Sequence, residues 1–124
     1  MKSFIIIISL VFSFGLQNTT GQIEPEAFKK AISENKDIQI VDVRTLKEFQ
    51  SGYIENAKHI DFYREGFQKE ILKLDKDKPI AVYCAVGGRS SSTAQFLRQQ
   101  GFKKVYDLKG GMFAWSRKGF KIIK

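Results

Sequence analysis

The only cysteine of this 124-residue chain, Cys84, stands at the start of a segment suited to hold negative charge. The residues that follow it are Ala85, Val86, Gly87, Gly88 and Arg89. The two glycines can adopt backbone angles that turn successive N–H groups inward, and a helix expected to begin near Arg89 or Ser90 adds its positive end. Such surroundings favour the thiolate of a cysteine, its nucleophilic form. We therefore predict a nucleophilic Cys84; the alternative is an unreactive buried cysteine, but packing alone requires neither two glycines nor an arginine.

The predicted secondary structure places Cys84 at the end of a buried strand. Ile80–Tyr83, directly before it, is a short run of apolar and β-branched residues. Similar patterns predict further strands at Ile38–Val43, Lys58–Ile60 and Val105–Asp107, and the family resemblance described below implies a short first strand near Gln22–Ile23. Helices are expected between them, beginning near Pro25, Thr45, Phe67, Ser90 and Gly110. This alternation predicts an α/β fold with a mostly parallel central sheet and helices on both faces, which binds ligands beyond the carboxyl ends of its strands.

Thr45 and Glu48 have the spacing of a capping box, in which each side chain satisfies a free backbone N–H of the other residue. The expected helix ends near Gln50, before Gly52. Glu48 is therefore interpreted as a helix cap and not as a general base.

The first 21 residues have the order of a secretory signal peptide. A positive start at Lys2 precedes the 13-residue apolar stretch Phe4–Leu16, and small and polar residues follow it. A membrane-spanning helix needs about 20 apolar residues, so this stretch is too short to remain as a membrane span. We expect cleavage before about Gln22 and export to the periplasm or the medium; a buried N-terminal helix or strand is the alternative.

Composition is consistent with one folded domain at residues 22–124. The chain is 43% hydrophobic and 27% charged, and it carries a net charge of +8. The basic residues are dispersed and no nucleic-acid motif accompanies them, so we expect anionic small molecules and not nucleic acid as partners. A single cysteine allows no internal disulfide, and the single histidine, His59, does not suggest a metal site.

Several segments, in chain order, resemble the rhodanese family over nearly all of residues 22–124. These segments are Asp42-Val43-Arg44 with Glu48-Phe49, Gly52-Tyr53-Ile54-Glu55-Asn56-Ala57, Tyr83 through Ser90, and Leu108-Lys109-Gly110-Gly111 with Trp115. Tyr53 departs from the pattern, because the family usually has histidine there. Each motif alone is weak, and their common order makes the resemblance specific.

The resemblance implies a three-layer fold and a sulfurtransferase that needs no cofactor and no metal. Cys84 would take sulfane sulfur from a small anionic donor, thiosulfate or a persulfide, and pass it to a thiol or to cyanide. The residues from Ala85 through Arg89 would bind the substrate and the persulfide through their N–H groups, with Arg89 also attracting the donor. Asp42 and Arg44 would be structural support for the neighbouring strand end, with direct contact to the substrate as the alternative.

Other functions remain open at this point. A cysteine-dependent phosphatase or arsenate reductase of the same fold is disfavoured, because those loops hold one more residue between cysteine and arginine. A non-enzymatic rhodanese-like binding module is also possible, although such modules commonly lack the cysteine. Met112, Phe113 and Trp115 are interpreted as residues that pack the last helix on the sheet.

Overall fold

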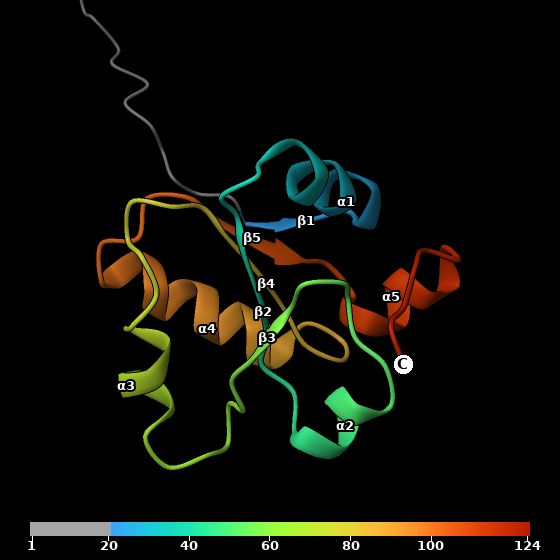
Figure 1. Cartoon of the computed structure of the whole chain (residues 1–124). Helices are drawn as coiled ribbons and strands as arrows, with labels where there is room; N and C mark the ends of the chain where they lie inside the picture. Colours follow the sequence, from blue (N-terminus) through green and yellow to red (C-terminus); the bar gives the residue numbers. More distant parts are fainter. Residues whose placement is uncertain (1–20) are drawn as a thin grey trace, which may run out of the picture.

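The computed structural model describes residues 21–124, and its centre is a parallel five-stranded sheet (Figure 1). The strand order is β1-β5-β4-β2-β3, and every neighbouring pair is parallel. The strands are β1 (Gln22–Ile23), β2 (Gln39–Asp42), β3 (Lys58–His59), β4 (Ile80–Tyr83) and β5 (Val105–Leu108). All were predicted to within two residues at each end.

Strand β4 is the buried centre of the sheet, because it hydrogen-bonds to β2 on one side and to β5 on the other. Its four residues are all buried, as expected of an apolar strand covered on both faces. Since side chains alternate along a strand, Ile80 and Val82 enter one hydrophobic cluster and Ala81 and Tyr83 enter another. Cys84 continues the first series and lies with that cluster.

Helices cover both faces of the sheet, which confirms the predicted three-layer α/β class. One face packs against α3 (Phe67–Ile71) and α4 (Gly88–Gln99), with Leu97 in its core. The other packs against α1 (Pro25–Glu34) and α5 (Gly111–Arg117), where Phe28 and Trp115 meet edge to face. The short helix α2 (Leu46–Gln50) follows β2 at the carboxyl edge of the sheet.

Helix α4 differs from the prediction in where it begins, and α3 is short. Helix α4 begins at Gly88, before the predicted Arg89 or Ser90, because Gly87 takes a left-handed conformation (φ 116°) as the N-cap residue. Helix α3 ends at Ile71, so Leu74 packs against the core from the turn that follows and not from the helix.

The predicted packing role of Phe113 is wrong. Met112 and Trp115, three residues apart, form the inward stripe of α5 and are buried. Phe113 lies outside that stripe and is 60% exposed.

The predicted signal peptide, apart from Gly21, lies outside the described residues. No helix within residues 21–124 combines the length and apolarity that crossing a membrane requires.

Candidate active site

Cys84 lies at the carboxyl end of β4, at the floor of an open pocket of about 590 Å³. The residue is only 1% exposed, so the pocket reaches its side chain without leaving it open on the surface. The pocket walls come from α2, from the segment between β3 and α3, from the loop after β4 and from the start of α4. They comprise Glu48, Phe62, Tyr63, Val86, Gly88, Arg89 and Ser92.

The sulfur of Cys84 has two polar neighbours. The Gly87 amide donates a hydrogen bond to Sγ at 3.1 Å, and the Ser90 hydroxyl lies 3.3 Å from Sγ. As a thiol, Cys84 donates to Ser90 Oγ; as a thiolate, the sulfur can only accept, and the Ser90 hydroxyl can rotate to donate to it. Helix α4, whose N-cap is Gly87, adds the positive end of a 12-residue helix.

The start of α5 holds the loop in place from the other side. The Met112 and Phe113 amides donate to the carbonyls of Cys84 and Ala85, at 2.8 and 3.0 Å. This approach is so close that a Cβ on Gly111 would lie 2.5 Å from the Cys84 carbonyl oxygen. Only glycine fits there.

Those carbonyl contacts also orient the amides of the loop. In a trans peptide the N–H points opposite to the preceding C=O, and no peptide of the described chain is cis. With the Cys84 and Ala85 carbonyls directed at α5, the Ala85 and Val86 N–H groups point away from it. Because α5 packs on the face opposite to the Cys84 side chain, these amides point toward the face that carries the sulfur.

Arg89 is paired with Glu48 at the wall of the pocket. Its Nη1 and Nη2 donate to the two Glu48 carboxylate oxygens at 2.7 and 2.9 Å. The guanidinium lowers the pKa of the Glu48 carboxyl to about 2, against a smaller opposing effect of burial and with help from Thr45. The predicted Thr45–Glu48 capping box is present, so Glu48 both caps α2 and holds Arg89. The guanidinium expected to attract an anionic donor therefore already has an anionic partner.

Asp42 and Arg44 form a second pair that lies away from the pocket lining. The Arg44 Nε and Nη2 atoms donate to the Asp42 carboxylate, and Nη2 also donates to the Gly52 carbonyl at 2.6 Å. Burial alone would lower the pKa of the Arg44 guanidinium, but the hydrogen bonds and charge of Asp42 outweigh it and raise the pKa. The pair ties the end of β2 to the turn after α2.

Asp107 belongs to the surroundings of the site, and sequence reasoning did not single it out. It lies on β5 and is 1% exposed, and its Oδ1 has no hydrogen-bond partner among the described residues. Burial raises the pKa of the Asp107 carboxyl, while Ser90 and Gln22 oppose the shift as hydrogen-bonding neighbours. The sequence did contain one signal for Asp107, because a charged residue stands at the end of the strand predicted at Val105–Asp107.

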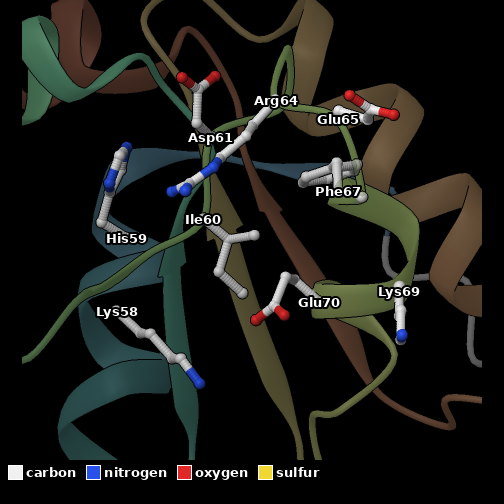
Figure 2. Close-up of a pocket in the computed structure, with 10 residues that line it drawn as sticks. Lys58, His59, Ile60, Asp61, Arg64, Glu65, Phe67, Lys69 and Glu70 are labelled. Atoms are coloured by element: carbon white, nitrogen blue, oxygen red, sulfur yellow. The ribbon is translucent and has the colours of Figure 1, made fainter.

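A second pocket, of about 450 Å³, lies beside β3 and α3 (Figure 2). Arg64 reaches toward His59 with Asp61 beside it, and Glu70 points inward. Its charged walls balance: Lys58, Arg64 and Lys69 against Asp61, Glu65 and Glu70. Cys84 does not line this pocket, and neither Asp42 nor Arg44 does. We therefore place the reactive site at the first pocket.

Comparison with known proteins identifies the family. The model of the rhodanese-like domain matches residues 24–118. A sulfurtransferase of Allochromatium vinosum is 30% identical over 103 residues, covering 83% of this chain and 94% of the relative. A thiosulfate sulfurtransferase GlpE of Coxiella burnetii is 43% identical over 82 residues, covering 66% and 75%.

Solved structures show the same architecture. A rhodanese-related protein from Thermoplasma volcanium superimposes with a TM-score of 0.73 at 29% identity, covering 83% of this chain and 97% of the other. The fold thus defines an α/β protein of rhodanese architecture, with a cysteine at the carboxyl end of its central strand. The chain belongs to the rhodanese family, and its curated relatives place it among the rhodanese-type sulfurtransferases.

Proposed function

We propose that this protein moves sulfane sulfur from a small anionic donor, thiosulfate or a persulfide, to a thiol or cyanide acceptor through a persulfide on Cys84. The observation that carries the proposal is the position of the Cys84 sulfur. It lies at the floor of an open pocket, with the Gly87 amide and the start of α4 directed at it. These groups stabilise negative charge on sulfur without a metal or a base.

The first step loads sulfur onto the protein. The Cys84 thiolate attacks the outer sulfur of thiosulfate, a new S–S bond forms, and the original S–S bond breaks with its electron pair leaving on sulfite. Cys84 then carries a terminal persulfide anion. The Ala85, Val86 and Gly87 amides point to the side on which this anion lies, so each can become a donor to it.

The second step unloads the sulfur. A nucleophile attacks the terminal sulfur, the bond between that sulfur and Sγ breaks, and its electron pair returns to Cys84 as thiolate. The protein is thereby restored, and donor and acceptor react in separate half-reactions. We expect ping-pong kinetics.

In this proposal Arg89 acts mainly through Glu48, and its attraction of the donor stays a prediction. Because Glu48 neutralises it, the pair presents no free positive charge to the donor. Its two hydrogen bonds instead hold the Glu48 carboxylate, which lines the pocket, so that this carboxylate does not face the incoming anion unpaired. The anion is then bound mainly by the backbone amides of the Cys84 loop and by the N-terminus of α4.

The decisive assay is turnover of thiosulfate and cyanide by the purified protein, measured as thiocyanate formed. Wild type should be active, Cys84→Ser inactive, and Ser91→Ala, an exposed change on the same helix, as active as wild type. Absence of thiocyanate together with hydrolysis of p-nitrophenyl phosphate would contradict the proposal and favour a phosphatase.

We also propose that the chain is exported and cleaved before about Gln22, on the strength of the charge and hydropathy order of residues 1–21. Mass measurement of the protein recovered from the periplasm or medium of an expressing bacterium tests this. Full-length protein confined to the cytoplasm would contradict it.

A further inference from the structure

Four large apolar side chains stand out on the surface of residues 21–124. Their exposed fractions are 54% for Leu46, 69% for Tyr63, 70% for Val86 and 60% for Phe113. An exposed apolar side chain does not gain the free energy that burial would provide. A reaction between small anions gives no reason for this exposure. Clustered exposed apolar groups mark surfaces that bind other molecules.

All four follow the carboxyl ends of strands and so lie at the edge of the sheet that carries Cys84: Leu46 after β2, Tyr63 after β3, Val86 after β4 and Phe113 after β5, where it lines a neighbouring pocket with Arg117. Tyr63 and Val86 line the Cys84 pocket itself. The Phe113 amide binds the Ala85 carbonyl, which places Phe113 beside the same loop. Leu46 is the first residue of α2, the helix that carries Glu48 to the pocket wall. We call these four residues the apolar rim.

Positive charge accompanies the apolar rim on both sides. Lys47 follows Leu46 on α2, and the Arg117 guanidinium lies 5.7 Å from the centre of the Phe113 ring. Neither cation forms an ion pair within the described residues, whereas Glu48 is taken up by Arg89. The chain as a whole carries +8, so long-range attraction also favours an acidic partner.

The depth of the sulfur restricts the shape of the partner. Cys84 is 1% exposed, so a flat protein surface cannot bring its own sulfur to it. A cysteine on a protruding segment can enter the pocket while the apolar residues beside it contact the rim.

We propose that the apolar rim docks an acceptor protein whose cysteine stands on a protruding apolar segment flanked by acidic residues. This rests on the proposed sulfur transfer and names its acceptor class. The partner's cysteine thiolate attacks the terminal sulfur of the Cys84 persulfide, forming a new S–S bond. The bond between that sulfur and Sγ breaks, Cys84 regains its thiolate, and the partner leaves as a persulfide.

The test uses synthetic peptides as acceptors for persulfide-loaded protein. One has the sequence Glu-Glu-Leu-Cys-Phe-Glu-Glu, its counterpart has Lys in place of each Glu, and N-acetylcysteine serves as the small thiol. Rates of sulfur transfer are followed by mass spectrometry at low and high salt. We expect the acidic peptide to react at least about tenfold faster than the basic one at low salt, with the preference shrinking as salt rises.

Variants then locate the contact. Leu46→Ser with Phe113→Ser should slow transfer to the acidic peptide about tenfold, and leave thiosulfate:cyanide turnover within about twofold of wild type. Neither residue lines the Cys84 pocket. Unchanged small-molecule turnover also shows that the variant folds.

Charge reversal supplies a matched control. Lys47→Glu with Arg117→Glu should abolish the preference for the acidic peptide. Lys36→Glu with Lys103→Glu makes the same charge change before β2 and β5, at the opposite edge of the sheet, and should preserve it. Equal rates for the two peptides in wild type, or equal effects of the two charge reversals, would overturn the docking proposal while thiosulfate:cyanide activity stands. Loss of that activity in wild type would instead overturn the sulfur transfer on which it rests.

Discussion

Two arginine–carboxylate pairs stand at the carboxyl edge of this sheet, and they differ in what surrounds them. Asp42–Arg44 is sealed, with side-chain exposures of 0% and 5%, while Glu48–Arg89 borders the Cys84 pocket with 33% and 17%. In both pairs the arginine makes bidentate hydrogen bonds to the carboxylate, so this geometry does not distinguish the roles of the two pairs. Burial does: the closed pair braces a strand end, and the open pair controls which charge faces the substrate.

The open pair also changes how the site must bind an anion. If Arg89 were free, it would be the obvious ligand for a negative donor. Because it is paired with Glu48, we propose that it contributes position and not net charge, and that backbone amides and the start of α4 bind the anion. Amides in a fixed loop need little reorganisation when charge develops on sulfur.

The largest effect is expected on the free energy of unfolding, when the buried Asp42–Arg44 pair is broken. Arg44→Met leaves the Asp42 carboxylate buried without its main partner and frees the Gly52 carbonyl. Loss of one partner of a buried pair costs about 3–5 kcal/mol of unfolding free energy. Urea denaturation of wild type and variant measures it, and a loss below about 1 kcal/mol would show that Asp42–Arg44 is no brace.

The second largest effect is expected on kcat/KM for thiosulfate, when the Glu48–Arg89 pair is broken. Arg89→Met should cost less stability, because solvent reaches Glu48, but it turns a bare carboxylate toward the pocket. We expect kcat/KM for thiosulfate to fall about 10- to 100-fold, since the anionic donor is repelled. The double variant Glu48→Gln with Arg89→Met removes that carboxylate and should recover most of the loss. Failure of the double variant to recover activity would assign Arg89 a direct contact with substrate.

Acid titration provides a smaller test of the open pair. The pKa of Glu48 is about 2 in the folded protein, against an ordinary glutamate pKa of 4.5. Because the folded pKa is the lower one, the contribution of Glu48 to stability is present above pH 4.5 and is lost as the pH falls toward 2. Glu48→Gln should reduce the slope of unfolding free energy against pH in that window. Equal slopes in wild type and variant would contradict the pairing.

Asp107 gives the smallest expected effect, and it shows what a buried carboxyl does without a bidentate arginine. Its folded pKa is raised from 3.8, chiefly by burial, so the stabilising state is the protonated one, present at low pH and lost as the pH rises through the folded pKa. Asp107→Asn should remove this loss and raise the free energy of unfolding near neutral pH. Denaturation at a series of pH values measures it; a less stable variant near neutral pH would mean that the charged form is favoured.

Local pattern was enough to predict much of this molecule. The strands came from apolar runs, and the Cys84 loop came from its glycines and the arginine that follows. Contacts between distant segments were not readable: Glu48 and Arg89 are 41 residues apart, and nothing near Glu48 distinguishes a cap from a cap that also binds a guanidinium. The predicted packing role of Phe113 was wrong for a related reason. An aromatic residue next to two packing residues gives no sign in the sequence that its own side chain points outward.

The early start of α4 depended on one backbone angle. A left-handed Gly87 ends the loop and begins the helix one residue before the arginine. The sequence shows only that a glycine can adopt this backbone angle, not that Gly87 does adopt it.

The central claim, that Cys84 carries sulfur, is tested most directly by the intact mass of the reduced protein after incubation with thiosulfate. Wild type should gain the mass of one sulfur atom and lose it again on addition of cyanide, while Cys84→Ser gains nothing. A wild-type mass that stays unmodified, with the thiol shown to be reduced, would contradict this account.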